Sequence, residues 1–125
     1  MAISLSTLSS QFIDIIAADT DTDAIVRADI TQSPGSLYYI KVINGISATS
    51  IFLKLYDNTT ATLGTTEPVF IIKVAASATR YCVIPDGMAF SSGITYAVTD
   101  QNGNQAAGGS FSGLSGTITL HMVAS

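Results

Sequence analysis

The chain has 125 residues, with five lysines and arginines against nine aspartates and glutamates, and its net charge is −4. This length fits one domain over residues 1–125, and the scattered basic residues exclude a phosphate-binding surface, so nucleic acid is not an expected partner. Charged residues make up only 11% of the chain and mean hydropathy is +0.44. A typical soluble domain has about 25% charged residues, so we expect another chain to cover part of the surface.

The first ten residues interleave serine and threonine with Ile3, Leu5 and Leu8. They contain neither the basic residues nor the unbroken apolar run of a secretory signal, and no apolar run in the chain reaches the length of a membrane span. We interpret residues 1–10 as an N-terminal arm and expect neither an export signal nor a membrane partner.

Two short strands are predicted next, over Phe12–Ile16 and Ile25–Ile30. A helix over Leu8–Ala18 remains an alternative, because four large apolar residues there would share one helical face.

The acidic run Asp19–Asp23 between these strands spaces oxygen ligands like the opening of a calcium loop. However, Ala24 stands where such a loop needs glycine, and Ile30 stands where it needs glutamate. We therefore prefer a solvated turn, and no metal or cofactor is expected.

Three dense apolar runs form the centre of the predicted fold: Leu37–Ile43, Ile51–Tyr56 and Val69–Val74. Runs of this kind between turn signals are typical of strands. Both faces of the first run are apolar except at Lys41, which indicates a strand that is covered on both sides or lines an interface. In the second run, one face is the better core candidate: Ile51, Leu53 and Leu55.

Three further strands are predicted over Arg80–Ile84, Ile94–Thr99 and Gly116–Val123. The first is expected to end at a tight turn, Pro85–Gly87, and residues 100–116 form a glycine-rich loop. Alternation with a period of two predicts three inward side chains in each of the last two strands: Ile94, Tyr96 and Val98, then Ile118, Leu120 and Met122.

About eight short strands with frequent turn signals and no convincing helix predict an all-β fold, an antiparallel β-sandwich of jelly-roll-like form. Catalytic groups are scarce. The one histidine, His121, falls on the polar face of its strand, and the one cysteine, Cys82, is interpreted as a buried or half-buried structural thiol. A zinc site needs several such ligands, and neither a nucleophile elbow nor a phosphate-binding loop is present. We therefore do not expect an enzyme.

Five segments in the middle of the chain resemble short virion structural proteins of tailed bacteriophages: Leu37–Asn44, Phe52–Asp57, Gly64–Pro68, Ile84–Phe90 and Ser92–Val98. The resemblance covers Ser36–Thr99. It implies a structural role in the virion, at the capsid surface or in the tail, for a protein made in the host cytoplasm.

Two classes of function follow as expectations. The favoured one is a capsid decoration or cement protein that self-associates as a trimer or dimer and docks on the major shell. The alternative is a small binding module of a tail or fibre, for carbohydrate or host attachment. Low charge favours large buried interfaces, and the chain has no tryptophan to stack on a sugar.

Two weakly structured segments carry isolated large apolar residues: Ile3, Leu5 and Leu8 in the arm, and Phe111 and Leu114 in the glycine-rich loop. Ordering such segments costs entropy unless a neighbouring surface receives their side chains. We predict that they contact a partner, and the alternative is that both fold back over the ends of their own domain.

Overall fold

The computed structural model describes residues 3–7, 15–19, 27–31, 34–100 and 116–125. This part of the chain forms nine strands and no helix, which confirms the all-β prediction. The strands are β1 (Ile3–Thr7), β2 (Ile15–Asp19), β3 (Arg27–Thr31), β4 (Gly35–Asn44), β5 (Ile51–Asp57), β6 (Phe70–Val74), β7 (Thr79–Phe90), β8 (Ile94–Thr99) and β9 (Ile118–Ala124).

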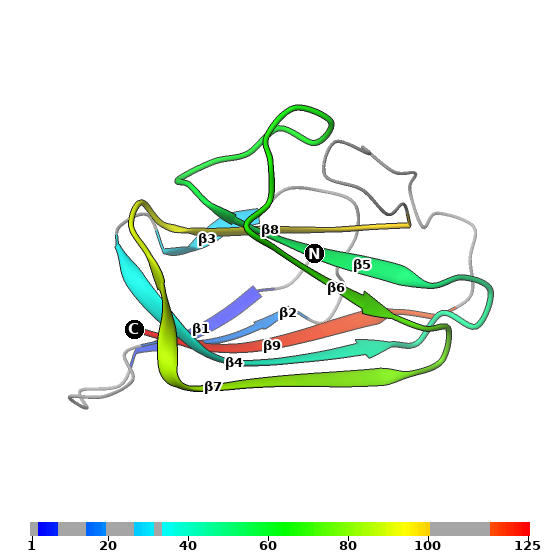
Figure 1. The fold of residues 1–125 in the computed structure, drawn as a ribbon. Coiled ribbons are helices and arrows are strands. Elements are labelled where there is room, and N and C mark those ends of the chain that lie inside the picture. The colour runs from blue at the N-terminus through cyan, green and yellow to red at the C-terminus, as the bar shows by residue number, and fades with distance from the viewer. Residues whose placement is uncertain (1–2, 8–14, 20–26, 32–33, 101–115) are drawn as a thin grey trace.

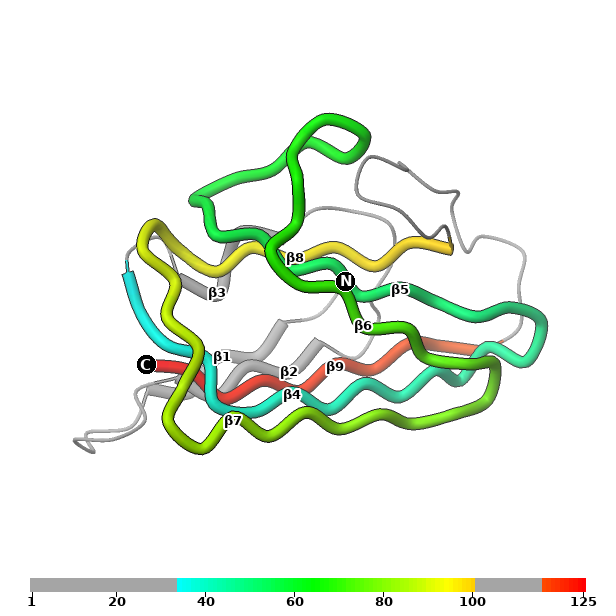
Figure 2. The backbone as a smooth tube through the Cα atoms, viewed as in Figure 1, coloured from blue at the N-terminus to red at the C-terminus, as the bar shows by residue number. Residues whose placement is uncertain are grey.

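The strands form two antiparallel sheets (Figure 1). The five-stranded sheet has the order β1-β2-β9-β4-β7, and the four-stranded sheet has the order β3-β8-β5-β6. Pairing is nested along the chain, since β2 pairs with β9, β3 with β8, β4 with β7 and β5 with β6. The backbone trace in Figure 2 crosses from one sheet to the other between β4 and β5, between β6 and β7, and again between β7 and β8.

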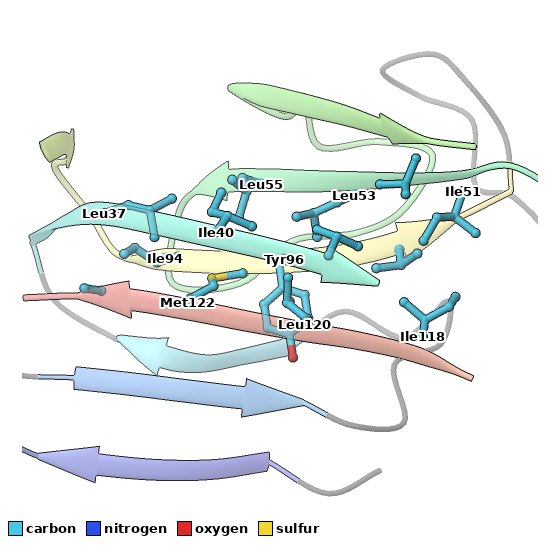
Figure 3. Close-up of a cluster of buried hydrophobic side chains, with 14 of the residues drawn as sticks. Leu37, Ile40, Ile51, Leu53, Leu55, Ile94, Tyr96, Ile118, Leu120 and Met122 are labelled. Carbon is cyan, nitrogen blue, oxygen red and sulfur yellow. The ribbon is translucent and has the colours of Figure 1, made fainter. Parts of the chain in front are cut away.

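The hydrophobic core lies between the two sheets (Figure 3). Its central side chains come from β4 and β9 of one sheet and from β5 and β8 of the other. Each of these side chains is at most 2% exposed. Burying one such leucine or isoleucine stabilises the fold by about 1.5–3 kcal/mol. The inward faces predicted for the three alternating strands are confirmed: Ile51, Leu53 and Leu55; Ile94, Tyr96 and Val98; Ile118, Leu120 and Met122.

The opposite face of β5 is buried as well, although it carries Phe52, Lys54 and Tyr56. The Lys54 side chain has no exposed surface, and burial lowers the pKa of its ammonium group. Alternation identifies which side chains share a face of a strand. It does not reveal whether a second layer covers that face, because this depends on the path of the rest of the chain.

The prediction that Pro85–Gly87 is a tight turn ending a strand is wrong. β7 continues through these residues to Phe90, and they form a bulge. On the β4 side, Tyr38 alone lies between the pairs Leu37↔Met88 and Tyr39↔Val83, so one residue faces the four residues 84–87. Gly87 adopts a φ of 80° in this bulge. A proline, an aspartate and a glycine suit a bulge as well as a turn, so local composition does not separate them.

The same irregularity explains why two residues of opposite parity in Leu37–Ile43 are both buried. Tyr38 also lacks a partner in the β9 ladder, which passes from Leu37↔Ala124 directly to Tyr39↔Val123. The extra residue changes the parity of β4, so Leu37 and Ile40 are both buried in the core although they are three residues apart.

The N-terminal segment contributes two strands to the five-stranded sheet. Ile3–Thr7, predicted to be part of an arm, is β1 and pairs with β2 of the same chain. The alternative helix over Leu8–Ala18 is wrong for Ile15–Ala18, which lies in β2, while residues 8–14 lie outside the described part. The strand predicted over Phe12–Ile16 is found in β2 at Ile15 and Ile16, and its first three residues lie outside the described part.

Candidate functional site

The candidate site is the outer face of the five-stranded sheet, on the side of β4, β7 and β9 that points away from the core. The ladder pairs Lys41 with Tyr81 on one side and with His121 on the other. Each of the three strands contributes three side chains to this outer face: Tyr39, Lys41 and Ile43 from β4; Thr79, Tyr81 and Val83 from β7; Thr119, His121 and Val123 from β9.

Two apolar side chains on this face are largely in solvent. Tyr81 is 63% exposed and Val83 is 66% exposed, and both belong to β7 at the end of the sheet. The Lys41 ammonium group lies 5.6 Å from the centroid of the Tyr81 ring. This is a cation–π contact of about 0.5–1 kcal/mol at an exposed position. It holds the tyrosine ring and a positive charge side by side.

A depression of about 140 Å³ lies beside this contact and is lined by Lys41, Ile43, Thr119 and His121. Typical small-molecule sites have about 300–1,000 Å³, so this depression is smaller than such a site. Its walls combine a lysine and a histidine with an apolar side chain and a hydroxyl. They can receive one carboxylate side chain of a partner protein through a charge-assisted hydrogen bond.

The two residues weighed as catalytic groups face opposite sides of the five-stranded sheet, and β4 lies between their strands. His121 is exposed on the outer face, whereas the half-buried Cys82 packs against the core. Within the described residues, no three histidine, cysteine, aspartate or glutamate side chains gather in a group able to hold a metal ion. Asp21 and Asp23 of the acidic run lie outside those residues.

The structure places only two of the five predicted partner-contact residues. Ile3 and Leu5 lie in β1, which is at the end of the five-stranded sheet opposite to β7. Leu8, Phe111 and Leu114 lie outside the described residues. The backbone of Ile3–Thr7 pairs within its own chain, and partner contact by all five side chains stays a prediction.

Sequence reasoning did not single out Tyr81 and Val83. The signal was present, because Arg80–Ile84 has large apolar residues at both parities of a strand, as Leu37–Ile43 does. Two neighbouring strands that are apolar on both faces indicate a sheet with one face in the core and the other available for contact.

Comparison of the chain with protein-family models, with curated proteins and with solved structures gave no match. Among the described residues there is no helix long and apolar enough to cross a membrane.

Proposed function

We propose that the chain is a structural virion protein of a tailed phage, a capsid decoration or cement protein that self-associates and docks on the major shell. The observation that carries this proposal is the exposure of Tyr81 and Val83 on a sheet face of a chain with only 11% charged residues. Exposed apolar side chains gathered on one face are typical of protein–protein interfaces. The resemblance over Ser36–Thr99 supplies the virion context.

The strand order supports the finer description of the fold as a jelly-roll sandwich. In a jelly roll, an antiparallel ribbon of four strand pairs is wrapped so that successive pairs fall in alternate sheets. The pairs β2·β9, β3·β8, β4·β7 and β5·β6 follow that scheme, with β1 added beside β2. Viral capsid proteins and lectins are among the proteins built this way.

The chemistry of the outer face suggests the kind of shell surface on which it docks. Lys41 supplies a positive charge, and His121 an imidazole ring, beside the apolar side chains Ile43, Tyr81 and Val83. A complementary surface presents a carboxylate next to apolar side chains, and such pairing of charge adds specificity to an apolar contact.

The alternative, a carbohydrate-binding or host-attachment module of a tail or fibre, has one feature in its favour, the depression lined by Lys41 and His121. Its volume of about 140 Å³ is below that of a typical site for a small ligand. The depression suits one side chain of a protein partner better than a sugar ring, which favours the shell protein.

Docking can be tested with particles of the source phage that lack this subunit. The purified chain is added at increasing concentration, and bound copies are measured by co-sedimentation and located by electron microscopy of the labelled subunit. We expect saturable binding as a dense lattice over the shell. Binding of a few copies at the tail tip, or no binding, would refute the proposal.

A matched pair of variants tests the face itself. Lys41→Glu reverses a charge on the outer face, and Lys73→Glu makes the same change at an exposed position of β6 in the other sheet. We expect Lys41→Glu to weaken binding to the shell at least tenfold, about 1.4 kcal/mol, while Lys73→Glu binds normally. Equal effects of the two variants would contradict the assignment of docking to this face.

A further inference from the structure

Along five residues of β7, one edge has no pairing partner among the described strands. The Asn44 amide donates a hydrogen bond to the Ala78 carbonyl at 2.9 Å. In an antiparallel ladder, hydrogen-bonded pairs alternate with non-hydrogen-bonded pairs. The β4 residues 42 and 40 therefore bond to their partners Arg80 and Cys82. It follows that the N–H and C=O groups of residues 79, 81 and 83 point away from β4.

No described strand pairs with that side of β7, which ends the order of its sheet. The residues whose backbone groups point to the free edge are the same ones whose side chains lie on the outer face, including the exposed Tyr81 and Val83. Edge strands are commonly protected by charged side chains, and β6 at the edge of the other sheet has the exposed Lys73. Positions 79, 81 and 83 carry no charge, and the one charged side chain of this segment, the exposed Arg80, belongs to the opposite face of the strand.

The free segment has defined limits on both sides. Before it, Ser77 has a φ of 57° in the turn from β6. After it, the bulge at residues 84–87 redirects the backbone, and Pro85 has no N–H to donate. The straight free edge is therefore Thr79–Val83, and its outward backbone groups are arranged symmetrically about Tyr81.

We propose that this edge pairs with the same edge of a second copy of the chain, antiparallel about a two-fold axis at Tyr81. In this register residue 81 faces residue 81 of the partner subunit, and residue 79 faces residue 83 in both directions, so all the outward backbone groups of the segment find partners. A register shifted toward the C-terminus brings in Pro85 and the bulge. A second copy supplies an extended segment of the right length and the same free edge.

The pairing joins two five-stranded sheets into one continuous sheet and brings the Tyr81 and Val83 side chains of both copies together on one outer face. This inference rests on the proposed function, in which the chain self-associates, and it deepens that function by naming the contact. A five-residue strand pair is smaller than a standard interface, so the dimer is expected to be weak in solution, with a micromolar or weaker dissociation constant. Many such contacts on one particle would reinforce one another.

Charge complementation at position 81 tests the two-fold axis. Tyr81→Lys alone places two like charges opposite each other, and Tyr81→Glu alone does the same with the opposite sign. Each variant should weaken the dimer at least tenfold, and an equimolar mixture should restore a species of twice 13.0 kDa in sedimentation or light scattering. Val69→Lys is the control, because Val69 is 56% exposed but lies before β6, away from the free edge of β7.

A cross-link provides a second readout. In the proposed register Arg80 faces Cys82 of the partner subunit as a non-hydrogen-bonded pair, whose Cβ atoms approach to about 4.5–5.5 Å and are within reach of a disulfide after small shifts. Arg80→Cys should give a covalent dimer on mild oxidation, and Arg80→Ser and the native chain should not.

Circular dichroism and melting temperatures confirm that each variant is folded. The proposal fails if the native chain is monomeric from micromolar to millimolar concentrations, if it is a trimer, or if the two charge variants do not complement each other. A chain that dimerises in this way but never binds a particle would refute the virion function and leave the β7 contact standing. A chain that docks on the particle as a monomer would refute the β7 contact and leave docking on the virion standing.

Discussion

Asn44, the last residue of β4, joins three parts of the chain through the hydrogen bonds of its buried side chain, so a substitution there should destabilise the fold. Its side chain is 1% exposed. The amide nitrogen Nδ2 donates to the carbonyls of Thr49 at 3.0 Å and Ala75 at 3.1 Å, with a longer contact to Val74 at 3.4 Å. The oxygen Oδ1 accepts from the Ile46 amide at 3.0 Å.

Asn44→Ala removes these hydrogen bonds and leaves the Ile46 amide without its acceptor in the core. A net hydrogen bond contributes about 1 kcal/mol, and a buried group left unsatisfied costs about 1–3 kcal/mol. We expect the free energy of unfolding to fall by about 3 kcal/mol, out of the roughly 5–15 kcal/mol of a typical domain. In urea unfolding, this loss should lower the midpoint by about 2 M without changing the slope.

Asn44→Asp keeps the shape and the acceptor but replaces the donor. A carboxylate there would face the carbonyl oxygens of Thr49 and Ala75, so the folded state favours the protonated acid, which can still donate one hydrogen bond. The folded pKa is then raised above the unfolded value of about 3.9, and the folded state binds more protons. The stability of this variant should therefore fall as the pH rises above about 4.

The control for this pair is Asn58→Asp in the exposed loop after β5, where Oδ1 only accepts from the Thr59 amide at 2.9 Å. Its stability should change much less with pH between 4 and 7 than that of Asn44→Asp, because no carbonyl oxygen is bonded to the side chain at this position. An Asn44→Asp variant whose loss of stability is the same at pH 4 and pH 7 would refute this role of the Asn44 amide, and so would an Asn44→Ala variant as stable as the native chain.

Three further predictions concern the bulge, a turn and metal binding. Gly87→Ala places a side chain at a residue with φ 80°, and its Cβ would lie 2.8 Å from Tyr38 Cε1. Thermal unfolding should show that the free energy of unfolding falls by about 1–2 kcal/mol or more. An unchanged melting temperature would contradict the bulge geometry. Backbone amides of the Ser91–Ser92 turn donate to Asp57 and lower the pKa of its carboxyl group. This stabilisation is present above the unfolded pKa and is lost as the pH falls through the folded pKa. Asp57→Asn should therefore melt at a lower temperature than the native chain at pH 7, and the difference in melting temperature should narrow below about pH 4. A difference that stays constant with pH would contradict stabilisation by the ionised Asp57 carboxylate. EDTA should leave the melting temperature unchanged, whereas a drop restored by calcium would mean that residues 19–23 bind the ion.

Much of the strand pattern follows from the sequence alone. Alternating side chains from Ile94 and from Ile118 onward predicted both the strands and their inward faces, because a period of two in hydrophobicity has one simple structural reading. The contact residues predicted from the sequence are not the residues of the candidate site. Of the five apolar residues proposed to contact a partner, only Ile3 and Leu5 are described, whereas the exposed Tyr81 and Val83 had not been singled out.

Only the tertiary structure shows which strands pair and which of their faces are covered. Local composition could not show that Pro85–Gly87 is a bulge inside β7, since the bulge exists only because β4 continues past it with Tyr38 as the single opposing residue. Nor could alternation show that both faces of β5 are covered while β7 is left at an edge. Strand order and the covering of faces depend on contacts between residues far apart in the chain, and the pattern within one strand does not identify which strands lie beside it.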